Sequence, residues 1–115
     1  MSEFAQLLQA AVNGIQKTGE YAFGRGAVVG DKTLIDALVP CVKAWEDCDD
    51  RGASLIEAFR EGAEAAVKGA KETEKIVARM GRAGNVGERS LGHPDAGAHG
   101  LGVIFTDISN LLRNK

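Results

Sequence analysis

Residues 30–40 decide the fold of this 115-residue chain, and they read Gly30-Asp31-Lys32-Thr33-Leu34-Ile35-Asp36-Ala37-Leu38-Val39-Pro40. A short acidic residue after a glycine is a typical helix start, so we expect Asp31 to cap the helix that follows. The apolar side chains after it recur with the 3.6-residue period of a helix buried along one side. These side chains are Leu34, Ile35, Leu38, Val39, Val42 and Trp45. Pro40 lies inside this pattern, and we expect it to kink the helix.

Two further helices are expected on either side of this one. The first begins at Ser2, a plausible N-cap, and ends near Gly19. Its apolar positions are Phe4, Leu7, Leu8, Ala11, Val12 and Ile15. The other begins at the capping box of residues 54–57, where Ser54 is the cap and Glu57 follows three residues later, and it runs to about Met80. Its expected core positions are Leu55, Ile56, Phe59, Ala63, Ala66, Ala70, Ile76, Val77 and Met80.

A fourth amphipathic helix is expected near the C-terminus, with apolar positions Leu101, Val103, Ile104, Ile108, Leu111 and Leu112. Strand signals are nearly absent, so the sequence predicts an all-α fold of four antiparallel helices in one domain, residues 1–115. Two glycine-rich loops, residues 19–30 and 81–98, each precede a helix. Antiparallel neighbours place these two loops at the same end of the bundle. Because helix N-termini attract anions, we expect a binding site there.

Composition narrows the functional classes. The net charge of −2 gives no support to nucleic-acid binding, and no apolar run is long enough to span a membrane. The first residues lack the pattern of a signal peptide, so the sequence predicts a cytoplasmic protein. Cys41 and Cys48 lie two helical turns apart, too far for a disulfide, and are expected to be buried thiols.

The loop of residues 81–98 is the strongest candidate for ligand binding, because it is long and contains arginines among its glycines. Arg25, Lys32, Arg82 and Arg89 offer positive charge for an anionic ligand. A P-loop is not supported, since Arg25 occupies the position of its first glycine and Asp31 interrupts the Gly-Lys pair. His93 and His99 do not complete a zinc site, and no catalytic triad is evident.

The two loops resemble motifs of the nucleotide-binding L subunit or domain of dihydroxyacetone kinases. The resemblance rests on residues 30–40 quoted above and on a second set of motifs, Gly81-Arg82-Ala83, Gly87-Glu88-Arg89-Ser90 and Gly92-His93-Pro94-Asp95-Ala96-Gly97-Ala98. The motifs occur in the family's order and at about its spacing. The resemblance covers essentially the whole chain, which corresponds to the C-terminal half of the family's domain.

This resemblance implies a fold and a ligand. The family's L domain is an eight-helix antiparallel barrel with a nucleotide at one end, so the chain is expected to form half of that barrel and to bind ADP or ATP. By resemblance, Gly26 contacts the nucleotide, Leu34 borders the adenine and Arg82 reaches the phosphates. The turn Asp95-Ala96-Gly97 would touch the nucleoside, and Ala96 stands where the family usually has proline.

The resemblance also implies what a partner would supply. In the family, aspartates near the start of the domain hold magnesium, and a second glycine-rich segment cradles the phosphates; neither motif occurs in this sequence. We therefore expect the chain alone to be inactive as a kinase, and magnesium to bind only where a partner supplies the aspartates. Three alternatives stay open: completion by a complementary N-terminal half-domain chain, a regulatory homodimer, and a relic that no longer binds nucleotide. A dihydroxyacetone-binding K subunit is a further expected partner.

Overall fold

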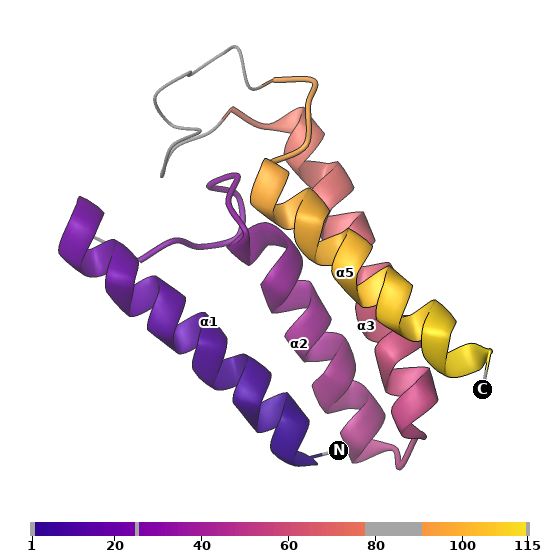
Figure 1. The fold of residues 1–115 in the computed structure, drawn as a ribbon. Helices are drawn as coiled ribbons and strands as arrows, with labels where there is room; N and C mark the ends of the chain where they lie inside the picture. The colour runs from indigo at the N-terminus through magenta and orange to yellow at the C-terminus, as the bar shows by residue number, and fades with distance from the viewer. Residues whose placement is uncertain (1, 25, 78–90, 115) are drawn as a thin grey trace.

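The computed structural model describes residues 2–24, 26–77 and 91–114. Its α-helices are α1 (Ser2–Phe23), α2 (Ile35–Asp50), α3 (Leu55–Glu72) and α5 (Ala96–Arg113), and a short 3₁₀ helix, η1 (Thr73–Lys75), follows α3. Figure 1 shows that successive α-helices run in opposite directions. The described residues contain no strand, so the predicted all-α antiparallel architecture is confirmed.

Helices α2 and α3 make most of the packing contacts of the bundle. Helix α3 packs along both α2 and α5, whereas α1 lies against α2 at the other side of the bundle (Figure 1). Within the described residues, no helix combines the length and the apolar character that crossing a membrane requires. The arrangement leaves one side of α1 and one side of α5 without a helical neighbour in the described part of the chain.

Aromatic side chains from all four α-helices form the centre of the core. Trp45 of α2 is fully buried, and its ring lies 4.4 Å from that of Phe4 and 4.8 Å from that of Phe59, between centroids. Phe59 of α3 in turn lies 6.2 Å from Phe105 of α5. The sequence pattern identified Phe4, Trp45 and Phe59 but missed Phe105. Aromatic contacts of this kind add to the burial of large apolar surfaces and fix how the helices pack.

Helix α3 can approach α2 closely because Gly69 has no side chain. A Cβ atom added to Gly69 would lie 2.2 Å from the backbone oxygen of Asp36 and 3.1 Å from the Cα of Ala37. That oxygen is the one to which residue 40 would donate in a regular helix, and Pro40 has no N–H to give. The carbonyl of Asp36 thus points at the Gly69 backbone across the helix pair. The close approach of the two helices depends on this glycine.

Two helix ends differ from the sequence-based expectation. Helix α1 continues past Gly19 and ends at Phe23, where Gly24 adopts a φ of 82° and donates its N–H to the carbonyl of Glu20. Helix α3 ends at Glu72, well before Met80, and Ile76 has an extended backbone with φ −125°. The apolar period that continued through Ile76 is therefore not helical there, and Met80 lies outside the described residues.

Several side chains expected in the core are exposed instead. Leu55 and Ile56 at the start of α3 are exposed, and so are Ile104 and Leu111 on α5. Ser54 does cap α3 as expected, since its hydroxyl accepts the N–H of Glu57. The helical period at these positions was thus read correctly, but the four apolar side chains stay exposed in the described structure.

Candidate functional site

The described parts of the two loops, the segment before α2 and the segment before α5, lie at the same end of the bundle, as the sequence predicted (Figure 1). Three hydrogen bonds fix the segments at this end. The side chain of Lys32 donates to the carbonyl of Ile76 at 3.1 Å, which joins the loop before α2 to the end of η1. The N–H of Asp95 donates to the hydroxyl of Thr73 at 2.9 Å, and the N–H of Gly92 donates to the carbonyl of Glu74 at 2.8 Å. These contacts connect residues far apart in the sequence.

Two buried carboxylates shape the loop before α2. Asp36 accepts the N–H groups of Gly30 at 2.8 Å and of Thr33 at 2.9 Å. Asp31 accepts the N–H of Val28 at 3.0 Å instead of capping the helix, so the predicted cap is wrong. The helix begins at Ile35, three residues later than a cap at Asp31 requires. The acid that organises this loop lies inside the helix, and a cap rule read from the preceding residues misses it.

Lys32 does not present its charge to the open end of the bundle. It is 1% exposed and is the one non-glycine residue with a positive φ (64°) in the described ranges. Its ammonium group points inward to the carbonyl of Ile76. The side chain of Lys32 thus holds the end of η1, and its role toward an anion stays a prediction. A long side chain in a left-handed conformation is strained, and such residues gather at functional loops.

The predicted turn at residues 95–97 is the start of a helix. Asp95 is the N-cap of α5, and its carboxylate accepts the N–H of Ala98 at 2.9 Å. Ala96 and Gly97 form the exposed first turn of α5. A Cβ atom added to Gly97 would lie 3.5 Å from the Cβ of Leu34, so the structure brings Gly97 and Leu34 into contact.

The remaining predicted site residues are placed differently. Gly26 packs against α1, where an added Cβ would lie 2.9 Å from the backbone oxygen of Gln16. The side chain of Gln16 also donates to the carbonyl of Ala27 at 3.0 Å, which holds this loop on α1. Arg82 lies outside the described residues, as do Arg25 and Arg89. Leu34 therefore lies next to residues 95–97, whereas Gly26 contacts α1.

No metal cage is formed by the residues that the structure describes. Groups of three or more His, Cys, Asp and Glu side chains that could hold an ion are absent from them. The carboxylates nearest the two loops are engaged with backbone N–H groups: Asp31, Asp36 and Asp95 each accept at least one. These acids stabilise the loops and do not match a magnesium site.

The two cysteines are buried free thiols, as expected. Burial raises the pKa of Cys41 to about 12. Burial also raises the pKa of Cys48, and so does its hydrogen bond to Glu61 at 3.3 Å. Because the thiolate is the reactive form, neither cysteine is suited to act as a nucleophile.

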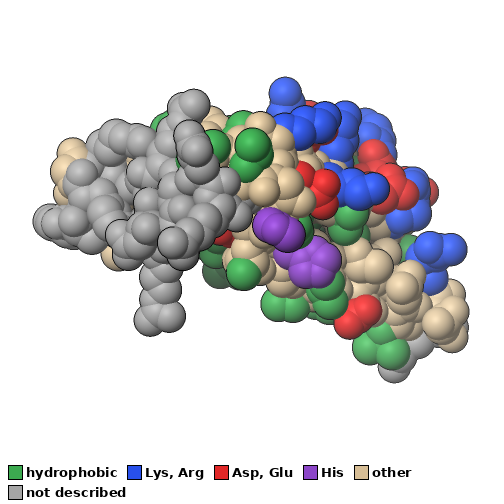
Figure 2. Space-filling view, turned by 90° about the horizontal axis from the view of Figure 1, so that it is seen from above, with side chains coloured by type: hydrophobic (Ala, Val, Ile, Leu, Met, Phe, Trp, Pro, Cys, Tyr) green, Lys and Arg blue, Asp and Glu red, His purple; other side chains and the backbone are tan. Residues whose placement is uncertain are grey.

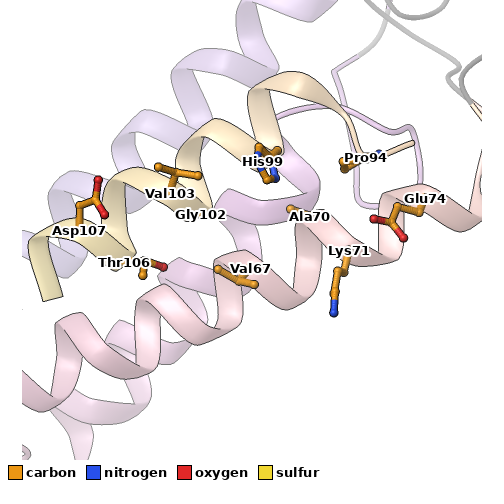
Figure 3. A pocket seen from close by; sticks show the side chains of 10 residues that line it. All are labelled: Val67, Ala70, Lys71, Glu74, Pro94, His99, Gly102, Val103, Thr106 and Asp107. Atoms are coloured by element: carbon orange, nitrogen blue, oxygen red, sulfur yellow. The ribbon is translucent and has the colours of Figure 1, made fainter. Parts of the chain in front are cut away.

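A hollow that sequence reasoning did not identify lies between α3 and α5 (Figure 3). It has a volume of about 310 Å³. Figure 3 shows Val67 and Ala70 on α3 opposite Val103 and Thr106 on α5. The available signal was the run of small residues at 62–70, which allows another helix or a ligand to lie close. The hollow reaches Pro94, just before the N-cap of α5.

Comparison with known proteins adds family evidence to this geometry. Residues 1–110 match the family described as the DAK2 domain. Over 113 residues the chain is 33% identical to the protein named "PEP-dependent dihydroxyacetone kinase 2, ADP-binding subunit DhaL" of Listeria innocua, a match covering 96% of this chain and 49% of the relative. It is 33% identical over 98 residues to the corresponding ADP-binding subunit of Escherichia coli, covering 85% and 44%.

A longer relative is also similar. The chain is 41% identical over 92 residues to "L-erythrulose kinase" of Pectobacterium atrosepticum, which covers 80% of this chain and 15% of that protein. The chain thus spans less than half the length of each of these three relatives.

Proposed function

This chain belongs to the DAK2 domain family, and on that premise we propose that it forms the nucleotide-binding part of a dihydroxyacetone kinase-type phosphotransferase. The proposed ligand is ADP or ATP, bound at the end of the bundle where the loop before α2 meets the start of α5. The contact between Leu34 and Gly97 carries the proposal, because it joins the two segments that bear the family motifs. Two relatives named as ADP-binding subunits support the choice of ligand.

The site chemistry assigns a part of the nucleotide to each residue. Leu34 offers a partly buried apolar surface next to the exposed, side-chain-free Gly97, which suits one face of the adenine ring. Asp95 is a carboxylate, so it favours hydroxyl donors of the ribose over phosphate oxygens. Arg82 is proposed to reach the phosphates, which an arginine binds through paired N–H donors. Gly26 belongs to the loop before α2, where that loop packs against α1, and Ala96 contributes the first turn of α5.

Calorimetric titration of the purified chain with ADP and with ATP tests this assignment. We expect saturable binding that weakens at least fivefold for Leu34→Ala and for Arg82→Ala. Arg113→Ala is the matched control, because Arg113 is an exposed arginine in the last turn of α5, at the other end of the bundle. Binding that is unchanged in both site variants would refute the assigned site. No heat at millimolar nucleotide would refute nucleotide binding by this chain.

We further propose that the chain does not transfer phosphate unaided. Phosphoryl transfer depends on metal ions that neutralise the developing charge, and the acids near the site are engaged with backbone N–H groups. Carboxylates for magnesium would then come from a complementary half-domain, and the acceptor from a dihydroxyacetone-binding K subunit. Magnesium-dependent turnover of dihydroxyacetone and ATP by the purified chain alone would overturn this.

The exposed apolar side of α5 favours a helical partner. Ile104, Ile108 and Leu111 follow a helical period, and all three are exposed. We propose that a complementary four-helix half covers this stripe, with a second copy of the chain as the alternative. Light scattering of the purified chain separates the two. Twice the chain mass would indicate a homodimer, and a single chain mass would favour a complementary half-domain as the partner.

Substitutions that place charges on the apolar stripe of α5 test whether this stripe is the contact. Ile104→Glu with Ile108→Glu should abolish the association, whereas Asn110→Glu, an exposed position on another side of α5, should leave it intact. Association that survives the double change would assign the contact to another surface. A chain that stays monomeric and also fails to bind a purified N-terminal half-domain would refute the helical partner.

A further inference from the structure

Two adjoining hollows form one groove along the outer side of α3 and α5, hereafter the α3–α5 groove. The first has a volume of about 310 Å³ and the second about 440 Å³. Val67, Lys71 and Thr106 line both hollows, so the two are continuous. The groove extends from Arg60 on α3 to Glu74 on η1, which is about 21 Å at the helical rise of ~1.5 Å per residue.

The first hollow is built to take an apolar group. Val67 and Val103 face it with 41% and 46% of their surfaces exposed, which is high for valine on a packed helix pair. Gly102 forms the floor, and a Cβ atom added there would lie 3.2 Å from Val67. Because Gly102 has no side chain, Val67 lies close to the backbone of α5, and both valines border the hollow. An aliphatic or aromatic side chain inserted there would remove this apolar surface from water.

Four cations and one acidic residue line the second hollow. Arg60, Lys68, Lys71 and Arg113 surround it, with Glu64 as its acidic residue. Glu64 pairs with Arg60 at 3.3 Å. Among the described residues, Lys68, Lys71 and Arg113 make no salt bridge. Figure 2 shows Lys and Arg side chains gathered along one edge beyond the two histidines, with a few acidic side chains among them.

We propose that the α3–α5 groove binds an acidic amphipathic helix of a partner protein. One apolar side chain of that helix enters the first hollow, and its carboxylates lie over Lys68, Lys71 and Arg113. The 21 Å length corresponds to a helix of about 14 residues, and a helix in an apolar groove is a common mode of peptide recognition. Unpaired cations at the rim select an acidic partner and speed its association. This inference does not depend on nucleotide binding.

The shape of the groove favours a protein segment over a membrane surface. Both hollows are concave, whereas a lipid surface contacts convex or flat faces. Glu74 and Asp107 line the first hollow at opposite ends (Figure 3), and both would repel an anionic headgroup layer. A helix can place its acidic residues over the cations of the second hollow and an apolar side chain in the first.

Fluorescence anisotropy with two synthetic helical peptides tests the proposal. Each probe has 14 residues with three leucines along one side, and the flanking positions are glutamate in the acidic probe and lysine in the basic probe. The full chain should bind the acidic probe at least tenfold more tightly than the basic one. The double change Lys68→Glu with Arg113→Glu should weaken acidic-probe binding at least tenfold, and Val103→Ser should weaken it severalfold. Lys43→Glu, an exposed lysine on α2, is the matched control and should have no effect.

Three outcomes would overturn the proposal. They are equal binding of the two probes, acidic-probe binding that is unchanged by the double charge reversal, and no acidic-probe binding at millimolar concentration. Vesicles of phosphatidylcholine and phosphatidylglycerol provide the lipid comparison. Vesicle binding that is lost in the double variant, without binding of the acidic probe, would assign the groove to a membrane surface and refute the protein partner. Circular dichroism of each variant confirms that the helices are retained.

Discussion

Replacing Gly69 by alanine should destabilise the protein, although alanine favours helices more than glycine does. The added Cβ would lie 2.2 Å from the backbone oxygen of Asp36, and ordinary contacts of this kind begin at 3.4 Å. Neither atom belongs to a flexible side chain, so α2 and α3 must separate by about 1 Å. Overpacking of this kind costs about 1–3 kcal/mol. A backbone clash belongs at the upper end of that range.

The helix propensity of alanine offsets part of this cost. An alanine in place of glycine stabilises a helix by about 1 kcal/mol, which leaves a net loss of about 2 kcal/mol for Gly69→Ala. With an unfolding entropy of about 2.1 cal/mol/K per residue, this chain should lose about 8 °C in Tm. Gly14→Ala is the matched control, since Gly14 lies in α1 with nothing within 4 Å of an added Cβ. It should gain about 4 °C.

Thermal unfolding followed by far-ultraviolet circular dichroism measures both shifts. Trp45 is the single tryptophan and is fully buried, so its fluorescence gives an independent probe of the core. The two variants should move in opposite directions. A Gly69→Ala protein as stable as the natural sequence, together with the expected gain for Gly14→Ala, would show that α2 and α3 are not in close contact at Gly69.

Three further changes test other contacts. Thr73→Val removes the hydroxyl that accepts the N–H of Asp95 and should cost about 1–3 kcal/mol in urea denaturation, with weaker ADP binding by calorimetry. Burial raises the pKa of Cys41 to about 12, so the unfolded chain loses this proton first and stability falls as pH rises above about 9. Cys41→Ala should flatten that alkaline decline in urea titrations from pH 8 to 11. The hydrogen bond from Arg51 lowers the pKa of Glu61. The ionised carboxylate therefore contributes to the free energy of unfolding above about pH 4.5, and this contribution is lost as pH falls through the lower pKa of the folded state. In acid titrations followed by circular dichroism, the stability of the Glu61→Gln variant should therefore depend less on pH than that of the natural chain.

Thr73→Val and Glu61→Gln each have a control within the chain. Thr18→Val removes an exposed hydroxyl that donates to the carbonyl of Gly14, and it should change stability by no more than about 0.5 kcal/mol. Glu64→Gln removes an exposed acid paired with Arg60 and should leave the acid titration close to that of the natural chain. Equal losses for Thr73→Val and Thr18→Val would contradict the proposed link to Asp95. An alkaline profile unaltered by Cys41→Ala would exclude the buried thiol as its cause.

The sequence by itself determined the helices and where the loops gather. Ser54 caps α3 as its capping box predicts, because the cap and its N–H partner are three residues apart. The 3.6-residue period of residues 35–45 likewise identified the side of α2 that buries Trp45. The antiparallel order of the helices predicted that the two glycine-rich loops begin and end at the same end of the bundle. The family motifs, read from residues 30–40 and 92–98, were confirmed by the DAK2 match.

Tertiary structure decided how the segments at that shared end contact each other. The apolar pattern of α3 continues through Ile76, but the helix ends at Glu72, where Thr73 accepts the N–H of Asp95 and Lys32 donates to Ile76. Tertiary contacts also bury the side chain of Lys32 and leave Ile104 exposed. A cap or an apolar period depends on neighbours within one or two turns, so the sequence displays it directly. The end of a helix, the direction of a long side chain and the burial of a helix face depend on distant segments, which only the folded chain brings together.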